Sequence, residues 1–176
     1  MAEVAGRQEL REILDAAIRG KEIATHFFAS LATSVDDVFL RRCFQRLSQE
    51  EWDHRKILLK HRRELFGRNI EGIRGAGREA AEAFSPMVGK PPIRSSEDLR
   101  VALRTAIRTE REVHRFFTEA SRNFDDRAVK VFLRILAEEG LAQIVHLQEA
   151  LAAVDSGIGG PRRRRSVRTG ARVRQN

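Results

Sequence analysis

Tyrosine is absent from this chain of 176 residues, and cysteine and tryptophan occur once each. The single cysteine, Cys43, excludes a disulfide framework and any iron or zinc site built from four cysteine thiolates. It indicates a reducing compartment and a buried, unreactive thiol. β-branched residues are also sparse, whereas alanine, leucine, arginine and glutamate, which favour helices, are abundant. The composition therefore predicts an all-α fold.

Long hydrophobic segments are also missing. No run of about 18 apolar residues occurs, so we expect no contact with a membrane. The first residues, MAEVAGRQELRE, contain no apolar segment of signal-peptide length. We therefore expect a cytoplasmic protein. An apolar content of 41% in a chain of this length is enough for one domain with its own core.

Acidic residues are missing from residues 156–176, which contain seven arginines. Seven of the eight net positive charges therefore belong to this tail, and residues 1–155 are close to neutral. We expect a folded domain over residues 1–155 and a disordered arginine-rich tail over 156–176. Through Arg162, Arg163, Arg164 and Arg165 the tail either binds nucleic acid or another polyanion without sequence preference, or has no specific partner. A localisation or assembly segment is a third interpretation.

Apolar residues recur at helical spacing in four long segments, at about residues 9–32, 36–66, 96–123 and 126–155. Short links join the first segment to the second and the third to the fourth, which predicts two antiparallel hairpins. The connection between the hairpins, residues 67–94, includes a short helical pattern, AGREAAEAF, followed by the breaker SPMVGKPP. It is long enough to run back along a bundle. The pattern predicts a four-helix bundle with a long crossover between helices two and three.

The two hairpins also resemble each other. Moving the sequence against itself by 89 residues aligns them without a gap. Phe27–Phe28 then meets Phe116–Phe117, and Asp36–Asp37 meets Asp125–Asp126. Any two amphipathic hairpins share leucine and alanine at such spacing, but the paired phenylalanines and aspartates favour a duplication. We interpret the bundle as two helical-hairpin repeats.

The stretch LSQEEWDH, residues 47–54, places Glu51 and His54 on the apolar stripe of the second segment, among Phe44, Leu47 and Leu58. Polar side chains on a stripe that faces the core need partners. Three interpretations of Glu51 and His54 follow: a buried polar network, a metal site, or a polar pair that leans towards the surface and does not belong to the core.

Four segments carry a resemblance to a known family: AIRGKEIATHFF (17–28), RLSQEEWDH (46–54), AIRTEREVHRFF (106–117) and ILAEEGLAQ (135–143). Over about residues 9–153 the chain resembles the ferritin-like superfamily, and within it the rubrerythrin-type bundles. In that family each half supplies one glutamate from its first helix and Glu-x-x-His from its second, and these six side chains hold two irons. The resemblance implies iron as a cofactor and a ferroxidase or peroxidase type of oxidoreductase. The four cysteines of a rubredoxin domain are absent.

The ligand set implied by this resemblance is only half present. Glu51, His54 and Glu110 match ligand positions, and we predict them as the metal ligands. The other three positions hold Lys21, Gly140 and Gln143. A one-residue shift, as in a π-bulge, would instead bring Glu22 and Glu139 to the centre.

The sequence is consistent with two functions. The first is a rubrerythrin- or ferritin-like metal-binding protein with an incomplete di-iron site, linked to iron or peroxide handling. The second is a non-catalytic bundle that acts as an interaction module through its basic tail, with the ammonium of Lys21 paired to Glu51 or Glu110 in place of a metal. The resemblance also implies a homo-oligomer that associates through exposed helix faces.

Overall fold

The computed structural model describes residues 2–67, 84–89, 91 and 93–157. It contains four long α-helices, α1 (Ala2–Ser34), α2 (Val38–Phe66), α5 (Ser96–Asn123) and α6 (Arg127–Asp155), and a short 3₁₀ helix, η1 (Ser85–Met87). All regular elements of the described residues are helical, which confirms the predicted all-α class. No helix among these residues has both the length and the apolar content needed to cross a membrane.

The helix bounds differ from the predicted ones at one end. α1 begins at Ala2, earlier than the predicted start near residue 9; residues 2–8 contain no proline that would stop the helix. The predicted helix AGREAAEAF lies outside the described residues except for Phe84. The arginines of the tail also lie outside them.

Aspartates at equivalent repeat positions begin the second helix of each hairpin. The Asp37 side chain accepts a hydrogen bond from the backbone N–H of Leu40, and Asp126 accepts from Ala128 and Val129. Such caps satisfy backbone N–H groups that have no partner inside the helix. Asp37 and Asp126, which the repeat aligns, thus have the same structural role.

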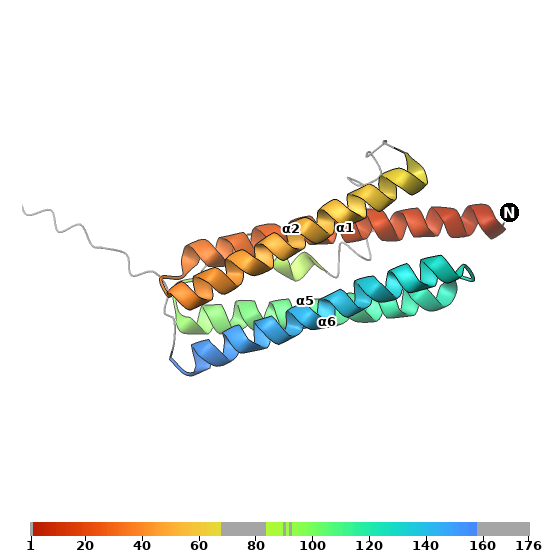
Figure 1. Ribbon diagram of the computed structural model, residues 1–176. Helices are drawn as coiled ribbons and strands as arrows, with labels where there is room; N and C mark the ends of the chain where they lie inside the picture. The colour runs from red at the N-terminus through yellow and green to blue at the C-terminus, as the bar shows by residue number, and fades with distance from the viewer. Residues whose placement is uncertain (1, 68–83, 90, 92, 158–176) are drawn as a thin grey trace, which may run out of the picture.

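The two hairpins lie side by side (Figure 1), with α1 against α2 and α5 against α6. α2 ends at one end of the bundle and α5 begins at the other, so the predicted long crossover is confirmed. α2 also contacts α6, whereas η1 contacts both α1 and α5. The end of the crossover therefore fills the space between the first helices of the two hairpins.

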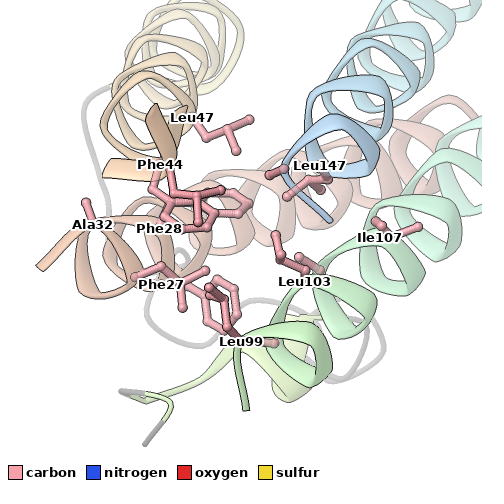
Figure 2. Close-up of a cluster of buried hydrophobic side chains, with 14 of the residues drawn as sticks. Phe27, Phe28, Ala32, Phe44, Leu47, Leu99, Leu103, Ile107 and Leu147 are labelled. Carbon is pink, nitrogen blue, oxygen red and sulfur yellow. The ribbon is translucent and has the colours of Figure 1, made fainter. Parts of the chain in front are cut away.

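The core consists of two apolar clusters. One cluster, part of which is shown in Figure 2, takes Phe28 from α1, Phe44 from α2, Leu103 from α5 and Leu147 from α6. The other lies towards the opposite end of the bundle and includes Leu14, Leu58, Phe117 and Leu133. Every helix passes from one cluster to the other, and the residues between the clusters form the candidate site.

Candidate metal centre: a buried polar layer

A layer of buried polar side chains separates the two apolar clusters. We define this polar layer as Lys21 of α1, Glu51 of α2, Glu110 of α5 and Gln143 of α6. Each of the four side chains belongs to a residue at most 3% exposed. In each helix the polar residue follows the last member of one apolar cluster and precedes the first member of the other. The helical period that buries the clusters therefore also turns these polar residues inward.

Lys21 and Glu51 form an ion pair inside the bundle. The Lys21 Nζ lies 2.9 Å from Glu51 Oε2, and neither side chain is open to solvent. Burial by itself acts to lower the pKa of Lys21, but the nearby carboxyl groups of Glu51 and Glu110 outweigh it and raise the pKa above its usual value. Lys21 therefore remains a charged ammonium at neutral pH.

Glu110 faces the same pair from α5. Burial raises its pKa to about 8, and the negative charge of Glu51 adds to this shift while Lys21 opposes it. Neither carboxyl oxygen of Glu110 has a hydrogen-bond partner among the described residues. At neutral pH Glu110 therefore carries a proton, and one ammonium balances the charge of one carboxylate.

Gly140 and Gln143 complete the layer from α6. A Cβ atom placed on Gly140 would lie 3.5 Å from Glu110 Oε2, so the glycine lies directly beside this carboxyl group. The side-chain amide of Gln143 is buried, and neither its nitrogen nor its oxygen has a hydrogen-bond partner in the described part of the chain. α6 thus contributes one amide where the family pattern has a carboxylate and an imidazole.

His54 lies at the rim of the layer. Its Nδ1 is 3.8 Å from Glu139 Oε2, and its side chain is 22% exposed. The structure places Glu51 and Glu110 together in the layer, while the contact it gives His54 is with Glu139. That Glu51, His54 and Glu110 bind a metal stays a prediction.

The alternative ligands Glu22 and Glu139 do not enter the layer. Glu22 is paired with Arg19 at 2.9 Å and faces Arg55 of α2 at 3.8 Å, and Glu139 faces His54. α1 and α6 remain α-helical through both residues, so the one-residue shift considered for them does not occur.

A second buried ion pair, between Asp15 and Arg62, was not predicted. Arg62 Nε lies 2.6 Å from Asp15 Oδ1, and Arg62 Nη1 donates to the carbonyl oxygen of Gly67. The ion pair between Asp15 and Arg62 thus links the C-terminal end of α2 to α1. A signal was available in the sequence, since Arg62 follows Leu58 by four residues and so shares its buried stripe.

The polar layer does not fit a two-iron centre. Such a centre in this fold uses six carboxylate and imidazole ligands. Here an ammonium contacts one carboxylate, Gly140 supplies no donor and an amide replaces an imidazole. Among the described residues, no three His, Cys, Asp or Glu side chains are grouped to hold a metal ion. The carboxyl oxygens of Glu110, Oε1 of Glu51 and the amide oxygen of Gln143 remain as hard donors for a single cation.

Comparisons with known proteins agree with this architecture. The chain matches the sequence model of the rubrerythrin family over residues 12–141. It is similar to the solved structure of a hypothetical protein from Pyrococcus furiosus, with a TM-score of 0.65 and 19% identity, over 84% of this chain and 91% of that one. At this identity the likeness concerns the fold alone. No curated protein matches the chain.

Proposed function

The chain belongs to the rubrerythrin family of ferritin-like metal-binding bundles, and we propose that it is a member whose di-iron centre is incomplete. The ion pair between Lys21 and Glu51 carries this proposal. An ammonium in contact with a ligand carboxylate supplies the positive charge that a metal would otherwise supply. The chain then binds at most one divalent cation, and it does so only when the cation displaces Lys21 from Glu51.

The proton on Glu110 is a second competitor for the cation. Carboxylates bind metals in their deprotonated form, so a bound cation has to displace this proton as well. We propose iron as the cation, held by oxygens of Glu51, Glu110 and Gln143. The role that fits these residues is the binding of iron rather than its oxidation, because the second metal position lacks its carboxylate at Gly140 and its imidazole at Gln143.

Substitution of Lys21 directly tests whether its ammonium competes with a cation for Glu51. We expect Lys21→Glu to bind manganous or ferrous ion at least about tenfold more tightly than the parent, because it removes the competitor and adds a carboxylate. The measurement is anaerobic calorimetric titration of both proteins. Lys60→Glu makes the same change of charge at an exposed position of α2 and serves as the control. Equal affinities for Lys21→Glu and the parent would refute the proposal.

A second candidate function rests on the seven arginines of residues 156–176, which no acid accompanies. We propose that they bind nucleic acid or another polyanion through phosphate contacts, which would make the binding steeply dependent on salt. The full chain should retain double-stranded DNA at low salt, and a chain ending at Asp155 should not. Equal retention by the two proteins would exclude this function.

A further inference from the structure

α2 has a positively charged stripe on its outer side, opposite the face that packs into the core. The stripe consists of exposed residues that recur every three or four positions and therefore share one side of the helix. We define this basic stripe as Arg42, Gln45, Gln49, Trp52, Lys56, Lys60 and Arg63. It contains four cations, two amides and no acid, and it extends over about 32 Å at about 1.5 Å per residue.

Two acids flank the basic stripe and neutralise part of its charge. Asp53 Oδ1 lies 2.6 Å from Lys56 Nζ, and Glu64 Oε1 lies 3.9 Å from Lys60 Nζ. α2 as a whole nevertheless contains eight lysines and arginines against four acids. Residues 1–155 together are close to neutral. The positive charge of the folded domain is therefore concentrated on this helix.

The second hairpin shows that the fold does not require such a stripe. The 89-residue repeat aligns the seven positions with residues of α6 that are exposed as well: Val131, Arg134, Glu138, Leu141, Val145, Glu149 and Ala152. This set contains one cation and two acids, and α6 as a whole contains three lysines and arginines against four acids. Two equivalent helices of one bundle thus have outer faces of opposite charge. Neither helix formation nor core packing accounts for the basic stripe.

Trp52, the single tryptophan of the chain, lies near the middle of the basic stripe and is 43% exposed. The guanidinium carbon of Arg55 lies 5.5 Å from the centre of the Trp52 ring. Arg55 Nη2 in turn lies 3.8 Å from Glu22 Oε1 of α1. Arg55 thus supports the indole from one side through a cation–π contact. An aromatic ring that remains in water between cations is suited to stack on a flat ligand that carries negative charge.

We propose that the basic stripe binds single-stranded nucleic acid, with a base stacked on Trp52 and phosphates in contact with Arg42, Lys56 and Arg63. Cations that follow the backbone and an aromatic ring that stacks on a base are the usual means of binding single strands without sequence preference. A duplex keeps its bases inside the helix, where Trp52 does not reach them. A lipid surface fits less well, because a helix that inserts into lipid needs an apolar face and Trp52 is the one apolar residue of the stripe. This site is separate from the arginine tail, and the proposal does not depend on binding by the tail.

The fluorescence of Trp52 in the full chain tests the stacking, because the chain has no other tryptophan. We expect an oligothymidylate of about 12 nucleotides to quench this fluorescence at a salt concentration of about 0.15 M. An abasic oligodeoxynucleotide of the same length has the phosphates without the bases. It should leave the fluorescence unchanged, even where its phosphates bind the tail. Equal quenching by the two oligonucleotides, or no quenching by oligothymidylate, would overturn the proposal.

Vesicles that contain phosphatidylserine test the alternative partner in the same assay. They should leave the emission of Trp52 unchanged, because the stripe has no apolar face to insert. A shift of the emission to shorter wavelength with vesicles would assign the stripe to a lipid surface and overturn the proposal.

Removal of one charge tests the phosphate contacts. We expect Arg42→Gln to raise the Kd for oligothymidylate, measured by quenching of Trp52, at least about threefold. Arg134→Gln removes the same charge from the outer face of α6 and is the matched control, which should keep the parental Kd. Circular dichroism verifies that both variants remain helical. An equal Kd for the two variants would contradict the placement of the strand on α2.

Discussion

Among single residues, Lys21 decides what the polar layer can do. Its ammonium contacts a carboxylate that the family pattern assigns to a metal, in a site without access to water. Two opposite charges are tolerated in such a site because each offsets the loss of hydration of the other. Neither side chain of the pair can be replaced alone without leaving an uncompensated charge or shifting a proton.

Loss of the Lys21 charge should destabilise the protein although the substitute is more apolar. We predict that Lys21→Met lowers the free energy of unfolding by about 3 to 5 kcal/mol, because Glu51 is left buried without its partner. Urea unfolding of the metal-free protein measures this change. Lys60→Met, at an exposed position, should change the free energy of unfolding by less than about 0.5 kcal/mol. Equal stability of the two variants would mean that Lys21 does not balance Glu51.

The proton on Glu110 predicts a specific dependence of stability on pH. The pKa of this group is raised by burial to about 8 in the folded chain from its usual value of 4.5. Its contribution to stability is therefore fully present below pH 4.5 and is lost as the pH rises towards 8, because the folded chain then binds more protons than the unfolded chain. Between these two pH values the free energy of unfolding of the parent should fall with pH more steeply than that of Glu110→Gln. We predict that the two slopes differ by at most about 1.4 kcal/mol per pH unit. Parallel stability curves for the two proteins would show that Glu110 is ionised at neutral pH.

At the scale of elements, the contact between α1 and the end of the crossover positions the polar layer. Phe84, directly before η1, is buried, and its ring occupies the space where a Cβ atom on Gly20 would lie. Gly20 immediately precedes Lys21. The missing side chain at Gly20 therefore allows the crossover to pack against α1 beside the polar layer.

Three glycines in helices should respond differently to the same substitution. Gly20→Ala should destabilise the protein by about 1 to 3 kcal/mol, because the Phe84 ring has to move. Gly6→Ala is the control in the same helix, since nothing lies within 4 Å of its Cβ position, and it should stabilise by up to about 1 kcal/mol. Gly140→Ala should also be tolerated, because its Cβ would make ordinary contacts with Glu110. Thermal melts rank the three variants, and a Gly20→Ala variant as stable as Gly6→Ala would contradict this packing.

The helices and the membership of the polar layer were largely predictable, and side-chain contacts were less so. The 89-residue repeat made Lys21 the equivalent of Glu110 and Gly140 the equivalent of Glu51, and the apolar stripes put Lys21, Glu51 and Glu110 on buried faces, because helical period and hydrophobic pattern determine which face is buried. The repeat does not specify which carboxylate, Glu51 or Glu110, forms the ion pair with the ammonium of Lys21, since this depends on the distances between helices. The apolar spacing of the second segment also put His54 on the buried stripe, although His54 lies at the rim, where the stripe meets the seam between α2 and α6.

At the scale of the whole molecule, the bundle has an apolar cluster on each side of its polar layer. Each cluster contains residues from all four helices, so both join the two hairpins. The layer between them already contains an ammonium, a carboxylate and a protonated carboxyl group. The fold should therefore be complete without a metal, unlike bundles in which buried carboxylates need metal ions to balance their charge.

Metal content of the full chain tests the incomplete centre most directly. The protein is purified without chelator, saturated anaerobically with ferrous ion, passed over a desalting column and analysed by mass spectrometry for iron per chain. We predict no more than one iron per chain and an unchanged melting temperature after treatment with chelator, because Lys21 already supplies the charge that iron would supply. Two retained irons per chain, with a melting temperature that falls when they are removed, would contradict the assignment of Lys21 to the place of a metal.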